Sequence, residues 1–177
     1  MARRRKMVAG WTKVILDNSL FPAQSRKMEV NKAVQNDIPE LCELLALLFA
    51  LEAEFQPDRQ RQAAGLRQIL DNPELGQILV ARDGAICVGM VNLLFTVSTA
   101  LGGRVAILED MIVHPTHRHA GIGTRLIQAA IQFSRSAGCR RVTLLTDQDN
   151  ISAQRFYTRH GFAHSEMIPM RMVFQPQ

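Results

Sequence analysis

The segment that most constrains the fold of this chain spans residues 113–126 and reads Val-His-Pro-Thr-His-Arg-His-Ala-Gly-Ile-Gly-Thr-Arg-Leu. An apolar run over 105–113 precedes the loop, and an apolar stretch with helical spacing follows it. This order predicts a strand, a tight glycine loop and a helix start, where backbone N–H groups and the helix dipole converge. Because Gly121 and Gly123 lack a Cβ, an anion can approach the backbone, which indicates capture of a phosphorylated cofactor.

The glycine spacing excludes two familiar phosphate-binding motifs. A dinucleotide fingerprint requires G-x-G-x-x-G, and Leu126 stands at the third glycine position. A nucleoside-triphosphate loop requires Gly-Lys followed by Ser or Thr, and the sequence has no Gly-Lys pair. The remaining pattern, Arg-x-x-Gly-x-Gly over 118–123, by itself indicates either an anion site or a helix start whose glycines only form a turn.

Length and composition predict one globular domain. The chain has 177 residues, of which 47% are hydrophobic and 21% are charged, as in folded rather than disordered proteins. No apolar run is long enough to cross a membrane, so no membrane association is expected. The three cysteines are widely spaced and odd in number, which predicts reduced thiols in a cytoplasmic protein. They are Cys42, Cys87 and Cys139.

The net charge of +5 is concentrated in the first 27 residues. Seven of the 21 Lys and Arg residues but only one of the 16 Asp and Glu residues lie there, so residues 28–177 carry 14 basic and 15 acidic side chains. Such a near-neutral domain is not expected to bind nucleic acid. We predict a domain over 28–177, opened by a strand-like stretch at Met28, and a basic extension over 1–27 that is either native or a product of start-site choice.

Periodicity and turn residues predict a mixed α/β fold with a central, twisted, mostly antiparallel sheet and about four flanking helices. Asp83-Gly84 is the strongest hairpin signal, and Leu101-Gly102-Gly103 marks a second turn. The apolar stretch 141–146 is of a kind found in the centre of a sheet. Strands are expected over 28–34, 77–82, 85–97, 104–113, 141–146 and as a pair within 162–174, and helices over 36–52, 58–70, 121–137 and 150–160.

A second motif lies one predicted helix and one predicted strand after the glycine loop: Asn150-x-x-Ala153-x-x-Phe156-Tyr157, followed by Gly161-Phe162. Together with Arg118-x-x-Gly121-x-Gly123 after a strand that ends in Val-His-Pro, it resembles the GNAT superfamily of acyl-CoA N-acyltransferases. The resemblance covers about residues 28–174. It implies the single-domain acyl-CoA N-acyltransferase fold, acetyl-CoA as co-substrate, and an N-acetyltransferase reaction that passes the acetyl group directly to an amine.

The resemblance also implies where the coenzyme binds. Its pantetheine arm would pair with the backbone of one strand, which family members splay from the next strand with a bulge. Asn150 is expected both to cap the last helix and to reach this arm. The pyrophosphate would lie on the glycine loop, which suits an anion independently of the resemblance. The residues implied are Met111, Ile112 and Val113 for the arm, and Arg118, His119, Ala120, Gly121, Ile122, Gly123 and Thr124 for the pyrophosphate.

Acylation of an amine requires a base for the amine and an acid for the departing thiolate. Tyr157, the only tyrosine in the chain, stands at the position of the family's usual general acid; the alternative is a half-buried aromatic that anchors the last helix. Glu109 is predicted to be the general base, directly or through a water, with Asp110 structural or positioning; alternatively, donors at the strand centre hold both acids. Strict alternation places Glu109 on the face of Met111 and Val113, and Asp110 on the opposite face.

The pattern His114-x-x-His117-x-His119 superficially suggests a metal site. The spacing crosses a proline turn with no local carboxylate or cysteine, so no metal is predicted, and loop packing or a phosphate contact is favoured.

The acceptor is expected to be a primary amine on a small molecule, with a peptide N-terminus or a lysine as the alternative. In the family its site is built from the first two helices and the loop between late strands, here about 49–55 and 168–172. Glu52 and Glu54 either attract a cationic amine there or belong to a solvated helix face. A non-catalytic acyl-CoA-binding sensor on the same fold is the alternative function. A homodimer fits the family, although no residue pattern specifies one.

Overall fold

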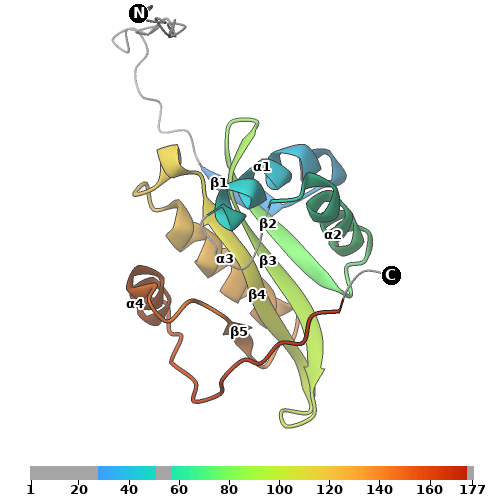
Figure 1. The fold of residues 1–177 in the computed structure, drawn as a ribbon, viewed down its shortest axis with the longest axis vertical. Helices are drawn as coiled ribbons and strands as arrows, with labels where there is room; N and C mark the ends of the chain where they lie inside the picture. The colour runs from blue at the N-terminus through green and yellow to red at the C-terminus, as the bar shows by residue number, and fades with distance from the viewer. Residues whose placement is uncertain (1–27, 51–56, 175–177) are drawn as a thin grey trace, which may run out of the picture.

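The computed structural model describes residues 28–50 and 57–174, which form a sheet covered by helices on both faces (Figure 1). The strands are β1 (Glu29–Lys32), β2 (Gly76–Asp83), β3 (Ile86–Ser98), β4 (Gly103–Val113) and β5 (Val142–Leu144). The helices are α1 (Ile38–Phe49), α2 (Arg59–Asp71), α3 (Ile122–Ser136) and α4 (Ile151–Arg159), with short 3₁₀ turns η1 (Gln35–Asp37) and η2 (Pro115–His117). None of these described helices combines the length and the apolar character needed to cross a membrane.

The sheet has the order β1-β2-β3-β4-β5. The first four strands pair antiparallel, and β5 runs parallel to β4. The predicted hairpin at Asp83-Gly84 joins β2 to β3, where Gly84 takes a φ of 63°, a left-handed conformation that glycine adopts without strain. The mixed α/β fold with a mostly antiparallel sheet is therefore confirmed.

Alternation along the strands divides the core between the two faces of the sheet. Ile78, Val80 and Met90 turn to one face and pack with residues of α1 and α2 such as Leu41 and Leu66. The intervening side chains pack on the other face against α3, so this helix is held directly behind the end of β4 from which its loop departs. The buried residues of this second layer include Leu79, Ala81, Val88, Val91, Leu93, Leu108, Ile122, Leu126 and Ile127.

The region after α4 differs from the sequence prediction. We expected a pair of strands within 162–174, but the structure has none there. Met167 and Ile168 are consecutive and each is 85% exposed, so neither alternating set of side chains is buried. A stable strand needs a partner for its backbone and a buried face for its apolar side chains, and Pro169 also lacks an N–H to donate. The predicted closing pair of strands is wrong for the described residues.

β5 is shorter and less central than its apolar sequence indicated. It has three residues, all half-buried, and it forms an edge of the sheet rather than its centre. A central position requires another strand on the far side of β5, and segment 162–174 does not supply one.

Candidate active site

β4 and β5 separate part of the way along β4. Their parallel pairing covers residues 106–108 of β4, and no described strand pairs with this edge of β4 over 109–113. Backbone N–H and C=O groups on that edge are therefore open to a partner other than a strand. This is the splay that the resemblance implied, and it lies directly before the glycine loop (Figure 1).

A bulge lies at the same level on the opposite edge of β4. Val91 of β3 pairs with Met111, whereas Leu93 pairs with Leu108, so Asn92 alone faces two residues of β4. The extra residue resets the alternation, because Leu108 and Met111 both pack on the α3 side although they are three positions apart. The implied bulge is thus confirmed. Its two residues are Glu109 and Asp110.

The bulge corrects the predicted placement of one carboxylate. Met111 and Val113 pack on the α3 side of the sheet, and Ile112 packs on the side of α1 and α2. Asp110, two residues before Ile112, lies on the latter side, as predicted. The alternation that placed Glu109 on the face of Met111 and Val113 does not hold across the bulge, and the Glu109 side chain is exposed.

The carboxylate of Asp110 is held by a residue that sequence reasoning missed. Asn92, which is only 4% exposed, donates a hydrogen bond from Nδ2 to Oδ2 of Asp110 at 2.7 Å. Burial raises the pKa of Asp110, and the neighbouring charge of Glu109 adds to the increase, whereas the Asn92 bond lowers it. The one sequence signal for Asn92 was an amide residue within the otherwise apolar middle of its strand.

The loop after β4 ends at a helix N-terminus without a side-chain cap. Arg118 donates from Nε to the carbonyl oxygen of Val113 at 3.3 Å, which ties the loop to the end of β4. His119 and Gly121 have φ values of 65° and 76°, so the backbone turns sharply before α3. The first intrahelical bond of α3 is accepted by the Gly121 carbonyl. The N–H groups of 122–124 therefore lack helical acceptors, which is the arrangement that an anion requires.

β4, the glycine loop and α4 meet around Gly123. A Cβ at this position would lie 3.6 Å from the Phe156 ring of α4 and 3.9 Å from the terminal methyl of Met111. The two sequence motifs, separated by a helix and a strand, are thus brought into contact. Of the other predicted loop residues, Ile122 is buried, Thr124 is half-buried and Ala120 is exposed.

The predicted residues of α4 occupy its first turn and its inner face. Asn150 accepts a hydrogen bond through Oδ1 from a backbone N–H of the first turn at 3.1 Å, which confirms the expected cap. The Tyr157 ring packs edge-on against Phe156 and Phe162, with centroids 5.3 and 5.8 Å apart. Its hydroxyl lies 3.9 Å from the Met111 sulfur, and burial raises the pKa of Tyr157. The side chain therefore anchors α4 and also presents a protonated hydroxyl to β4.

The histidines of the loop take part in a turn. The Nδ1 atoms of His114 and His117 lie 2.8 and 2.9 Å from the Thr116 hydroxyl. Nε2 of His117 is 3.7 Å from the Asp83 carboxylate, and His119 is exposed. Among the residues that the structure describes, no three His, Cys, Asp or Glu side chains are grouped so as to hold a metal ion.

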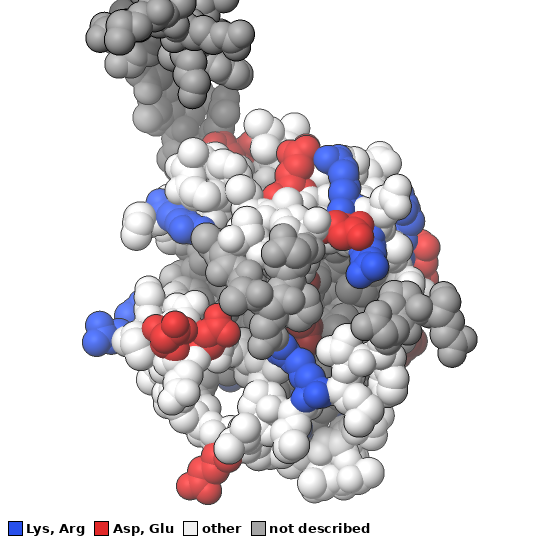
Figure 2. Space-filling model, in the orientation of Figure 1, with Lys and Arg blue, Asp and Glu red and all other residues white. Residues whose placement is uncertain are grey.

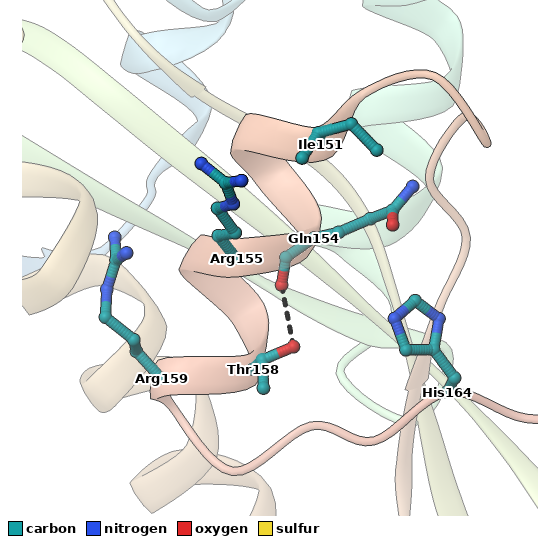
Figure 3. A pocket seen from close by; sticks show the side chains of 6 residues that line it. All are labelled: Ile151, Gln154, Arg155, Thr158, Arg159 and His164. Atoms are coloured by element: carbon teal, nitrogen blue, oxygen red, sulfur yellow. Dashed lines mark hydrogen bonds between the residues drawn. The ribbon is translucent and has the colours of Figure 1, made fainter.

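An open hollow lies on the outer face of α4 (Figure 3). Phe156 and Tyr157 belong to the opposite, inner face of the helix and pack with the sheet layer. Figure 3 shows Arg155 and Arg159 pointing away from Gln154, so the two guanidinium groups do not converge with the Gln154 amide in the hollow. The hollow on the outer face of α4 is therefore distinct from the split between β4 and β5. Its lining residues are Ile151, Gln154, Arg155, Thr158, Arg159 and His164.

Charged side chains of both signs are interspersed over the face shown in Figure 2. Among the described residues this face carries no continuous basic area, in keeping with the near-neutral composition of 28–177.

Comparison with known proteins identifies the family. Residues 38–162 match the Acetyltransferase (GNAT) family. The uncharacterized N-acetyltransferase YhfO of Bacillus subtilis (strain 168) is 33% identical over 121 residues, which cover 67% of this chain and 80% of that protein. The aminoalkylphosphonate N-acetyltransferase of Salmonella typhimurium is 29% identical over 137 residues, which cover 77% of this chain and 86% of that protein.

A solved structure shares the fold. The aminoglycoside N-acetyltransferase AAC(6')-Iy, in complex with CoA, superposes with a TM-score of 0.70 at 18% identity, over 82% of this chain and 94% of that chain. The glycine loop, the split beside β4 and the Asn150–Tyr157 motif all lie within the matched residues 38–162. The chain belongs to the GNAT family of acetyltransferases, which use acetyl-CoA.

Proposed function

We propose that this protein transfers the acetyl group of acetyl-CoA directly to a primary amine on a small molecule. The observation that carries the proposal is the meeting of three features at Met111. They are the open edge of β4, the α3 N-terminus beside Gly123, and the Tyr157 hydroxyl 3.9 Å from the Met111 sulfur. In that order they supply backbone partners for the pantetheine arm, donors for the pyrophosphate, and an acid for the thiolate.

The predicted coenzyme residues suit these parts chemically. The N–H groups of 122–124 point out of α3 toward the space in front of the loop, and Arg118 fixes the loop through its bond to Val113. The open backbone of 111–113 offers donors and acceptors to the amides of the pantetheine arm. Because Asn150 uses Oδ1 for its cap, its Nδ2 remains to donate to a carbonyl of the same arm.

In the proposed reaction the neutral amine nitrogen attacks the thioester carbon, so that a C–N bond forms and the C–S bond breaks. The proton that nitrogen loses passes to Glu109, directly or through a water. The departing sulfur takes the proton of the Tyr157 hydroxyl, and exchange with solvent then restores both side chains.

Direct transfer is favoured because the described cysteines are poor nucleophiles. Cys87 is 5% exposed, and burial together with a hydrogen bond to the Glu40 carboxylate raises its pKa to about 12. Burial also raises the pKa values of Cys42 and Cys139. Since only the thiolate attacks a thioester readily, these side chains do not support an acetyl-cysteine intermediate.

A small-molecule acceptor is supported by the relative from Salmonella typhimurium, whose name specifies an aminoalkylphosphonate. The predicted acceptor region includes Phe49 at the end of α1, and Ile168 and Met172, which are exposed. Glu52 and Glu54 lie outside the described residues.

Release of free thiol from acetyl-CoA across a panel of small primary amines tests the proposal. Turnover that depends on one of these amines is the expected result. Tight binding of CoA without turnover of any amine would instead favour a non-catalytic acyl-CoA sensor. Turnover restricted to peptides would favour a peptide or protein acetyltransferase.

We predict that Gly121→Ala weakens CoA binding about 10-fold or more, because a lost hydrogen bond to a charged group is worth about 1.5–3 kcal/mol. The new methyl group would meet no protein atom within 4 Å, so it would project into the space in front of the loop. The φ of 76° also strains alanine by roughly 1–2 kcal/mol. Isothermal titration with CoA measures the change in affinity.

Gly138→Ala is the matched control for strain. Gly138 has the same φ of 76° and the same open surroundings, but it follows the other end of α3. This variant should lose similar thermal stability and bind CoA as the wild type does. Equal loss of CoA affinity in both variants would contradict a pyrophosphate site at Gly121.

A further inference from the structure

At the bulge of β4 the buried Asn92 of β3 and the half-buried Asp110 of β4 form a polar pair that the proposed reaction does not use. Asn92 is 4% exposed and donates from Nδ2 to Asp110 at 2.7 Å. Its other amide atom, Oδ1, is buried and has no hydrogen-bond partner among the described residues. Rotating the amide would turn the acceptor Oδ1 toward the Asp110 carboxylate, which would lose the present hydrogen bond and leave Nδ2 unpaired. A buried polar atom without a partner is unfavourable and unusual, so the pair requires an explanation.

The carboxylate in this pair lacks a cation. Within the described residues Asn92 is the only side chain that bonds to Asp110, and the salt bridges found there do not include it. The charged group that acts on Asp110 is Glu109, which repels it. The titratable residues of the packed helix α1, Glu40 and Glu43, are acidic, and no Lys or Arg of the described residues acts on the pKa of Asp110. A half-buried carboxylate in such surroundings favours binding of a positive charge from outside.

The position of the pair connects it to the reaction. Asp110 lies at the level where β5 ceases to pair with β4. The next residue, Met111, points to the other side of the sheet and contacts the Tyr157 hydroxyl. The proposed acid and the half-buried carboxylate of Asp110 thus approach the split from its two sides, across two consecutive residues of β4. A group bound at Asp110 therefore lies near the place where the thioester must be attacked.

We propose that Asp110 binds the ammonium group of the acceptor amine, and that Asn92 is the positioning residue that holds the Asp110 carboxylate. This inference rests on the proposed N-acetyltransferase function. A primary ammonium ion brings the missing positive charge and three N–H donors. The neighbouring, exposed Glu109 then receives one ammonium proton and releases it to solvent. This leaves the neutral amine in place for attack and an ionised Glu109 to take the proton that nitrogen loses on acylation. The half-buried Asp110 thus recognises the ammonium group, and the exposed Glu109 transfers its proton.

Steady-state kinetics of Asp110→Asn test the recognition role. We expect the KM for the amine to rise about 30-fold or more, while the Kd for CoA and the melting temperature change little. The exposed Glu43 of α1 offers a matched control, and Glu43→Gln should leave the amine KM unchanged. A fall in kcat alone, or an unchanged amine KM, would overturn the assignment even when the wild type is active.

The Asn92→Leu variant tests whether Asn92 acts by holding the Asp110 carboxylate or only by packing in the core. The Asn92 bond lowers the pKa of Asp110, so its removal raises that pKa further. Since only ionised Asp110 attracts ammonium, the acidic limb of kcat/KM for the amine should move to higher pH. An equal loss of kcat/KM at every pH would show that Asn92 only packs in the core, and would overturn its part of the proposal.

A binding measurement that needs no turnover keeps the inference independent of the proposed function. The 13C signal of the Asp110 carboxyl is titrated with pH in CoA-saturated protein, with n-butylamine as the probe and 1-butanol as the neutral control. We expect n-butylamine, but not 1-butanol, to lower the pKa of Asp110. If no amine is acetylated, the proposed function fails, and this titration still decides the inference. Equal titration curves with both probes would overturn it.

Discussion

A Tyr157→Phe enzyme is expected to lose about 100-fold or more in kcat, the usual contribution of a positioned general acid. The phenyl ring preserves the edge-on contacts with Phe156 and Phe162. The hydroxyl that is removed has only the Met111 sulfur, at 3.9 Å, as a partner among the described residues. The melting temperature should therefore change little, and the loss of kcat would report chemistry rather than packing.

The pH dependence of kcat provides a second readout for Tyr157. Burial raises the pKa of this phenol above its ordinary value of about 10. The acid therefore stays protonated through the neutral range, and loss of its proton should lower wild-type kcat only above about pH 10. The Phe variant should lack this falling limb. Unchanged turnover together with an unchanged profile would leave Tyr157 only as the aromatic anchor of α4.

The second large effect is expected from Glu109→Gln. Near neutral pH the acceptor is protonated, so removing the proposed base should lower kcat/KM for the amine about 100-fold. The side chain is exposed, and surface substitutions of this kind usually change stability by no more than about 0.5 kcal/mol. Thiol release measured at saturating acetyl-CoA and varied amine gives the ratio directly.

Raising the pH distinguishes a base from a merely electrostatic group. Above the pKa of the acceptor amine, most of the amine in solution is already neutral, so it does not need Glu109 to remove the ammonium proton. The loss of kcat/KM in Glu109→Gln, relative to the wild type, should therefore become smaller as pH rises. The exposed Glu43→Gln control should show no loss of kcat/KM at any pH. A constant deficit across the range would assign Glu109 to charge alone, and no deficit would exclude it from catalysis.

Features that depend on neighbouring residues were predictable from the chain. Asp83-Gly84 forms the β2–β3 hairpin because Gly84 adopts a positive φ without strain. Asn150 caps α4 through a bond to its own first turn. Gly121 precedes α3 with a φ of 76°, at the end of the loop that follows the predicted strand. Each feature is determined within a few positions, so a single sequence reveals it.

Features that depend on pairing between distant segments were not predictable. The face of Glu109 was inferred from alternation, but the bulge opposite Asn92 is a property of the β3–β4 register. The apolar alternation within 162–174 looked like strands, although no described strand lies beside it to pair. The Asn92–Asp110 bond joins residues 18 positions apart, and neither residue signals the other locally.

The sequence by itself determined the family motifs, the strand–loop–helix junction at residues 113–126 and the identity of Tyr157 as the candidate acid. Backbone preferences and helix caps act over short stretches of chain, which is why these features could be predicted from the sequence before the fold was known. Only the tertiary structure decided that β5 leaves β4 after residue 108, that Tyr157 reaches Met111, and that a carboxylate without a cation lies in the bulge. Register, burial and charge environment arise from contacts between segments far apart in the chain, so they exist only once the sheet has formed.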